Sequence, residues 1–181
     1  MIDLTPKLFL IPIIGLLFVI VGCFYLSKRT TNGLFPTFIL ILIIIGFVLN
    51  FIWELLHSPL YVGYINNTHH VLISALASVA DALMSIFLYA CFAFIFKNPF
   101  WIKFLIIKRA VLVGIVGGMG AIVSEMLHVS GGDWAYGPAM PIIPFLNVGL
   151  SPVLQFIMLP LSSYFFGFYL LKFGNRFKAL K

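Results

Sequence analysis

Charged residues are scarce in this chain: only 9% of its 181 residues are Asp, Glu, Lys or Arg, whereas 62% are hydrophobic. Soluble domains carry roughly 25% charged residues, so the composition excludes a water-soluble globular protein. The net charge of +6 does not indicate a nucleic-acid-binding surface either, because the Lys and Arg residues cluster at the ends of apolar segments. The composition predicts an integral membrane protein whose main partner is the lipid bilayer.

The chain has only two cysteines and shows no internal sequence repeat. The two cysteines, Cys23 and Cys91, both lie in apolar runs, and we interpret them as core residues and not as a disulfide. The lack of an internal repeat argues against a complete secondary transporter, since many transporter folds are built from repeats. We predict a single integral membrane domain over residues 1–181, with no separate soluble domain.

The chain is rich in long apolar segments, and five of these segments are long enough to cross a bilayer. The fold class predicted from them is all-α: a polytopic helical membrane bundle. The predicted helices cover residues 8–27, 34–57, 71–96, 105–128 and 152–173. Ser151 is the predicted N-cap of the last helix, with Pro152 at its first helical position.

The basic residues predict the orientation of this bundle. Ten of the eleven Lys and Arg residues lie in the first and third connections, at the adjoining helix ends or near the C-terminus, and only Lys7 lies on the other side. The positive-inside rule then places the N-terminus outside and the C-terminus inside. We expect a multi-pass protein of a bacterial inner (cell) membrane.

The five acidic residues are the rarest charged group, and three of them lie inside predicted helices. Glu54 and Glu125 lie about one turn from the outer ends of their helices, and Asp81 lies near mid-bilayer. No Lys or Arg is available at that depth, so each carboxyl group should be protonated, bound to a metal, paired with His or hydrated. Ionisable groups in membrane helices indicate function, and we predict Glu54, Asp81 and Glu125 as catalytic residues.

Polar and small residues recur at helical spacing on four predicted helices, which places them in stripes. The stripes comprise Asn50, Glu54 and His57, then Ser74, Ser78, Asp81 and Ser85, then Gly114, Gly118, Ala121 and Glu125, with Gln155 on the last helix. The small residues allow a close approach of another helix. Stripes at similar depth predict one shared cavity that opens toward the outside. The alternative for the serines and Gln155 is a role in holding helices together.

The most distinctive stretch is the outer loop "SGGDWAYGPAMPIIPFLNVGLSP", residues 130–152. Its prolines stiffen the backbone, and its Asp, Trp and Tyr side chains favour a lid over the cavity. The alternative is an anchor at the membrane interface. The predicted substrate-binding residues of the cavity and loop are Asn50, Trp53, Ser78, Asp133, Trp134, Tyr136 and Gln155.

The spacing Glu-x-x-His occurs twice, at Glu54–His57 and Glu125–His128. Carboxylate-bridged di-metal bundles use this spacing twice, with one further carboxylate from each of two other helices. Asp81 could supply one of these, but the second is missing, and so short a motif arises easily by chance. A divalent metal held by these four residues is one hypothesis for a cofactor.

Two functions and a structural alternative fit these residues. A carboxylic acid in an apolar cavity can protonate a substrate, which favours an enzyme that acts on a lipid or isoprenoid by acid/base chemistry. The same acids would also suit a non-enzymatic protein that binds or transports a ligand, a metal or a proton. A buried polar network with only a structural role is the third possibility, and the residues leave open whether the chain is an enzyme.

Several motifs resemble a family of small, uncharacterised bacterial multi-pass membrane proteins. They are "NFIWE" (50–54), Asp81-Ala82-Leu83, Glu125 and "WAYGPAMPIIP…GLSPVLQ" (134–155). This resemblance covers most of the chain after residue 46, implies a membrane fold, and does not include His57 or His128. A second resemblance is to membrane carotenoid enzymes of the lycopene cyclase and hydratase kind, and it is carried by Glu125, Gly132, Trp134, Tyr136 and Pro141.

Overall fold

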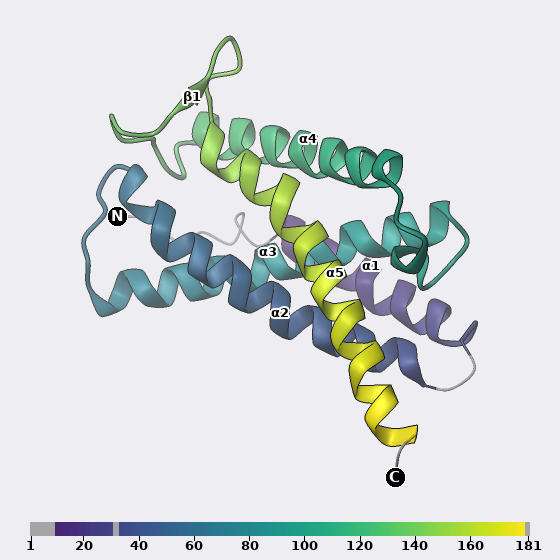
Figure 1. The fold of residues 1–181 in the computed structure, drawn as a ribbon. Coiled ribbons are helices and arrows are strands. Elements are labelled where there is room, and N and C mark those ends of the chain that lie inside the picture. Colours follow the sequence, from purple (N-terminus) through teal and green to yellow (C-terminus); the bar gives the residue numbers. More distant parts are fainter. Residues whose placement is uncertain (1–9, 31–32, 180–181) are drawn as a thin grey trace.

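The computed structural model describes residues 10–30 and 33–179 (Figure 1). Its α-helices are α1 (Leu10–Ser27), α2 (Leu34–His57), α3 (Thr68–Ile95), α4 (Ile107–Gly131) and α5 (Leu150–Ala179). Two short 3-10 helices, η2 (Ser58–Leu60) and η3 (Trp101–Phe104), and two strands, β1 (Ile142–Ile143) and β2 (Val148–Gly149), lie in the connections. The predicted all-α helical bundle is confirmed.

Four of the helices, α2 to α5, are long and apolar enough to cross a membrane. In α1 the apolar stretch at Ile13–Ser27 is shorter, and residues 8 and 9 of the predicted first helix lie outside the described residues. Large hydrophobic side chains are exposed on all five helices, where a bilayer would cover them. The fold is compatible with an integral membrane protein, and its orientation stays a prediction from the charges.

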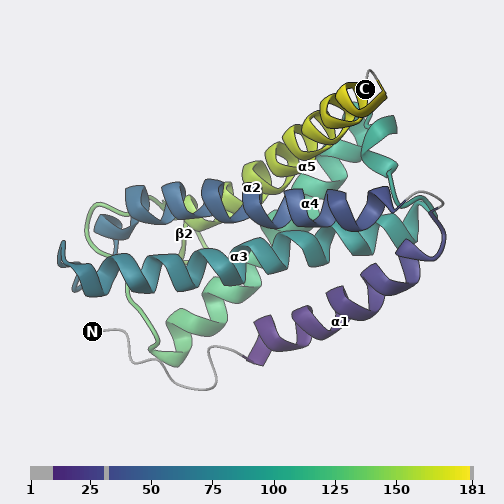
Figure 2. The same ribbon diagram turned by 90° about the horizontal axis from the view of Figure 1, so that it is seen from below.

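The packing order of the helices differs from their order in the chain. Helix α3 lies between α1 and α2 (Figure 2), and α5 packs against both α2 and α4. By contrast, α3 and α4 contact each other at few points. This arrangement leaves room between α3 and α4, next to the polar residues of both helices.

An aromatic core joins α2, α3, α5 and η3. Phe38, Tyr89, Trp101 and Tyr164 are fully buried and stack edge-on or face-on with one another. The buried polar atoms are satisfied, since the Trp101 indole donates to the Tyr89 carbonyl at 3.2 Å and the Tyr89 hydroxyl donates to the Pro99 carbonyl at 2.7 Å. This core fixes the relative positions of α2, α3 and α5, which carry Glu54, Asp81 and Gln155.

Small residues bring α4 and α5 close together, as the sequence predicts for that face of α4. A Cβ atom at Gly117 would lie 2.4 Å from the backbone oxygen of Phe156, closer than real Cβ contacts allow. At Gly118 the same atom would lie 3.0 Å from the Ile157 side chain. Helix α5 can therefore approach α4 only because α4 has glycine at these positions.

Several helix boundaries differ from the prediction: α4 covers Ile107–Gly131, α5 ends at Ala179, and α3 and α5 both begin earlier than expected. Helix α3 begins at Thr68, earlier than expected, because the Asn67 side chain caps it by accepting a hydrogen bond of 2.9 Å from the His70 amide. Helix α5 begins at Leu150, so Ser151 lies in its first turn and is not the predicted N-cap. The Ser151 hydroxyl is free to contact another helix.

Candidate functional site

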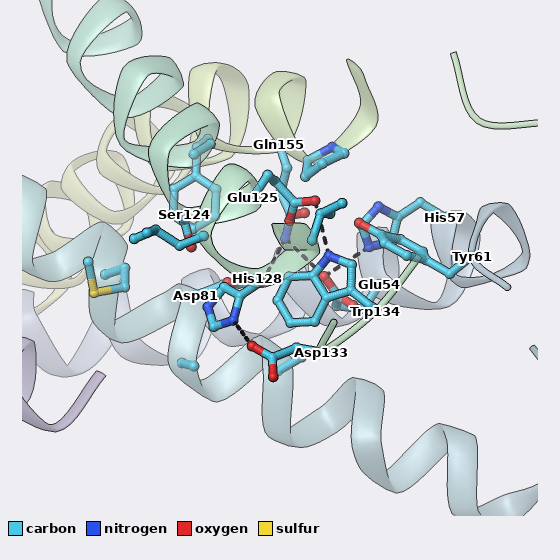
Figure 3. A pocket seen from close by; sticks show the side chains of 18 of the residues that line it. Glu54, His57, Tyr61, Asp81, Ser124, Glu125, His128, Asp133, Trp134 and Gln155 are labelled. Carbon is cyan, nitrogen blue, oxygen red and sulfur yellow. Dashed lines mark hydrogen bonds and ion pairs between the residues drawn. The ribbon is translucent and has the colours of Figure 1, made fainter. Parts of the chain in front are cut away.

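A cavity of about 980 Å³ lies between α3 and α4, and Glu54, Asp81 and Glu125 all line it (Figure 3). The end of α2, the start of α5 and the two loops after α2 and α4 complete its wall. Most of the remaining lining residues are apolar, and the lining contains no Lys or Arg among the described residues. The structure thus brings the three predicted catalytic residues from three helices to one cavity.

Gln155 of α5 connects two of these acids. Its Nε2 atom lies 2.8 Å from Asp81 Oδ2, 3.3 Å from Glu54 Oε1 and 3.0 Å from Asn50 Oδ1. The amide nitrogen of Gln155 carries two hydrogens, so its three acceptor atoms share these two hydrogens. Gln155 is buried and therefore holds the Glu54 and Asp81 carboxyl groups next to each other at the wall of the cavity.

Glu54 also belongs to a hydrogen-bonded chain that runs through His57. The Glu54 Oε1 atom lies 3.0 Å from His57 Nε2, and the other ring nitrogen of His57 lies 3.1 Å from the Ser151 hydroxyl. His57 is buried, with 6% of its surface exposed. An imidazole with partners on both nitrogens can pass a proton between them, so this chain can connect Glu54 to the start of α5.

Glu125 is held by the loop that follows its own helix. Its Oε2 atom accepts hydrogen bonds from the Trp134 indole at 3.2 Å and from the Tyr136 hydroxyl at 2.5 Å. The Oε1 atom has no partner among the described residues and is not fully buried. Glu125 is therefore fixed in orientation by two donors to one oxygen, and its second oxygen carries no hydrogen bond from the described residues.

The start of this loop is shaped by the end of α4. Gly132 caps the helix in the left-handed conformation, with φ of 76°, and the chain turns back so that Asp133 Oδ2 lies 2.7 Å from His128 Nδ1. The Trp134 ring stacks on the His128 ring with centroids 4.3 Å apart. The predicted lid residues Asp133 and Trp134 are thus packed against α4 at the cavity wall.

The loops after α2 and α4 are joined by backbone hydrogen bonds. The Val62 amide donates to the Ala135 carbonyl at 2.9 Å, and the Gly137 amide donates to the Leu60 carbonyl at 2.7 Å. Tyr61 and Tyr136 form the bridge between the two segments. The rigidity predicted from prolines has this additional source, together with the pairing of β1 and β2.

Tyr61 is a cavity residue that the sequence analysis did not identify. Its ring packs against His57 and Tyr136, with centroids 5.4 Å and 5.7 Å away, and it lines the cavity. Burial, and then the charges of Glu125 and Glu54, raises the pKa of the Tyr61 phenol. Burial and the hydrogen bond to Glu125 likewise raise the pKa of the Tyr136 phenol. Both hydroxyls keep their protons at neutral pH.

The predicted substrate-binding residues divide into two groups. Asp133, Trp134 and Gln155 line the cavity, whereas Asn50, Trp53, Ser78 and Tyr136 do not. Asn50 and Ser78 are buried and bond to the carbonyls of residues four positions earlier, at 2.8 Å and 2.6 Å. The Trp53 indole nitrogen is buried without a hydrogen-bond partner in the described part of the chain. Tyr136 acts on the cavity through Glu125.

The four predicted metal ligands do not form one cluster. His57 bonds to Glu54 and Ser151, and His128 bonds to Asp133. Among the residues that the structure describes, no group of three or more His, Cys, Asp or Glu side chains has the arrangement of a metal site. Metal binding by these residues stays a prediction from the sequence.

The chain matches no protein-family model, no curated protein and no solved structure.

Proposed function

We propose that this protein takes an apolar molecule of the lipid or isoprenoid class from the bilayer into the cavity between α3 and α4, and that its acids transfer a proton to or from that molecule. The observation that carries the proposal is the position of Glu54, Asp81 and Glu125, which line one largely apolar cavity from three helices. Acids in such surroundings suit general acid/base chemistry. The resemblance to membrane carotenoid enzymes points in the same direction.

Access from the bilayer is supported by the side chains between α3 and α4. Leu76, Met119 and Val123 line the cavity, and 41%, 61% and 57% of their surfaces are exposed. Exposed apolar side chains in the wall support entry of an apolar molecule between α3 and α4. Its volume of about 980 Å³ is at the upper end for small-molecule sites, which commonly measure roughly 300–1,000 Å³.

The two sides of the cavity suggest different tasks for the acids. Glu125 presents an unbonded oxygen and is oriented by Trp134 and Tyr136, so it is suited to act directly on a bound molecule. Glu54 and Asp81 share Gln155, and Glu54 continues to His57. This second group is suited to take up or return a proton. The alternative is a binding protein in which the same groups hold a ligand without turnover.

The test begins with the purified protein in mild detergent, followed by mass spectrometry of bound metal and co-purified lipid. The identified lipid is then incubated with the protein in D₂O, because proton transfer to carbon exchanges hydrogen for deuterium. We expect deuterium in the lipid or in a product. Glu125→Gln should retain the lipid but abolish the label, and Ser162→Ala, on the exposed side of α5, should leave the label unchanged.

Three results would contradict parts of this proposal. A retained lipid without label or product would indicate the binding protein. Stoichiometric metal that is lost in His57→Ala and His128→Ala would instead support the predicted metal site. The absence of both lipid and metal, together with variants that change only thermal stability, would leave a structural polar network.

A further inference from the structure

The hydroxyl group of Tyr61 has no hydrogen-bond partner among the described residues, although Tyr61 lies in the wall of the cavity. The side chain itself is well fixed: its ring contacts His57 and Tyr136, and its backbone neighbours bond to the loop after α4. Figure 3 shows His57, Tyr61, Glu125 and Trp134 gathered around one space. A rigid side chain thus presents an unpaired polar group to an apolar cavity.

The chemistry of this position makes Tyr61 a donor. The groups that face it are the carboxyl groups of Glu125, Glu54 and Asp81, the Tyr136 phenol and the His57 ring. A tyrosine phenol has an ordinary pKa of about 10 and keeps its proton at neutral pH, and burial and the neighbouring acids raise the pKa of the Tyr61 phenol further. The Tyr61 hydroxyl is not fully buried, so it is open to the cavity. A bound molecule without an acceptor would cover the hydroxyl and leave it unpaired, which is unfavourable, whereas an acceptor atom on the molecule would avoid that cost.

We propose that Tyr61 positions the bound molecule by donating a hydrogen bond to an oxygen atom on it, which makes the ligand an oxygen-bearing lipid or isoprenoid and not a pure hydrocarbon. This inference rests on the proposed function, because it concerns the same cavity and names the ligand more closely. An alcohol, ether or carbonyl oxygen at this point would lie among the three acids. The rest of the ligand would occupy the apolar part of the cavity between α3 and α4.

The choice of ligand follows from the cost of leaving a polar group unpaired. A hydrocarbon of the same size fills the cavity but leaves the Tyr61 hydroxyl without an acceptor. A site built to hydrogen-bond an oxygen therefore discriminates against the analogue that lacks it. Tyr169 of α5 provides the comparison, since it is not among the described residues that line the cavity and 61% of its surface is exposed.

The experiment measures binding of three probes to the full chain in lipid nanodiscs: farnesol, farnesyl methyl ether and the hydrocarbon farnesene. The wild type should bind the two oxygen-bearing probes about 3- to 10-fold more tightly than farnesene, as expected for one hydrogen bond. In Tyr61→Phe this ratio should fall to about one, with farnesene affinity unchanged. Tyr169→Phe should keep the wild-type ratio. Retained farnesene binding also shows that Tyr61→Phe is folded.

A second measurement on the wild type does not depend on any variant. The carbonyl stretching band of bound geranylacetone should shift to lower wavenumber than in an apolar solvent, because the Tyr61 hydroxyl donates to it. An unshifted band, or an unchanged probe ratio in Tyr61→Phe, would overturn the role of Tyr61 while the proposed function stands. A wild type that binds none of the probes would overturn both proposals for isoprenoid ligands.

Discussion

At the scale of single residues, Gln155 is the side chain on which most of the polar network depends. It donates from one nitrogen to Asp81, Glu54 and Asn50. We predict that Gln155→Leu lowers the free energy of unfolding by about 1–3 kcal/mol, because it leaves buried acceptors without a donor. Thermal or denaturant unfolding in detergent measures this change.

Ser163→Ala is the matched control for that substitution. Ser163 is buried on the same helix, but its hydroxyl bonds only to the Leu159 carbonyl of its own helix, at 2.8 Å. We expect a smaller loss of stability than in Gln155→Leu. An equal loss in both variants would mean that Gln155 stabilises the bundle through packing and not through the acids.

The two tyrosines of the joined loops predict how stability depends on pH. Burial raises the pKa of the Tyr61 and Tyr136 phenols, whereas the unfolded chain ionises its tyrosines near pH 10. Their contribution is therefore complete below about pH 10 and is lost as pH rises further. Between about pH 8 and 11, the melting temperature should fall less steeply in Tyr61→Phe/Tyr136→Phe than in the wild type. Parallel curves would contradict this.

Single residues also show what the sequence can and cannot predict about the site. Glu54, Asp81 and Glu125 were found because a carboxyl group in an apolar run is costly without a function. Helical periodicity placed Asn50 and Ser78 on the same stripes, but it cannot separate a cavity wall from a buried helix contact. Tyr61 was missed because it lies in a loop, and its position depends on backbone bonds to a segment distant in the sequence.

At the scale of the helices, the contact between α4 and α5 depends on Gly117. A methyl group there would lie 2.4 Å from a backbone oxygen of α5, which no side-chain movement can relieve. We predict that Gly117→Ala lowers the free energy of unfolding by about 1–3 kcal/mol or separates the two helices. The melting temperature and the retention of the cavity ligand measure both effects.

Gly120, one turn further along α4, provides the comparison. A Cβ atom there would meet nothing within 4 Å, so Gly120→Ala should be neutral or slightly stabilising through its helix propensity. A similar loss of stability in both variants would show that the helix tolerates alanine poorly for reasons other than contact with α5.

Helix types and approximate bounds followed from the apolar runs, because a bilayer-spanning helix needs a minimum length of apolar residues. The ends depended on local hydrogen bonds that composition does not reveal. Asn67 extends α3 by accepting from the His70 amide, and Ser151 is drawn into α5, where it contacts His57. The pairing of β1 and β2 was not predicted, since strands of two residues leave no periodic pattern.

At the scale of the whole molecule, the number of spans decides on which sides of the membrane the termini lie. Helices α2 to α5 alone would place both termini on one side, whereas α1 as a fifth span places them on opposite sides. The basic residues predict an outer N-terminus and an inner C-terminus. In bacterial cells, a C-terminal green fluorescent protein should therefore fluoresce, and an N-terminal alkaline phosphatase should be active. Fluorescence without phosphatase activity would indicate four spans.

The helices do not pack in the order in which they are synthesised, and this affects how the protein is inserted into the membrane. Helices α1 to α3 form one packed group, and α4 packs mainly on α5, which in turn packs on α2. Glu54 and Asp81 emerge from the ribosome well before Gln155, the residue that bonds both. Until α5 is inserted, both carboxyl groups lack the Gln155 donor, although Glu54 still has His57 of its own helix as a partner. The arrival of α5 then supplies this donor and closes the bundle.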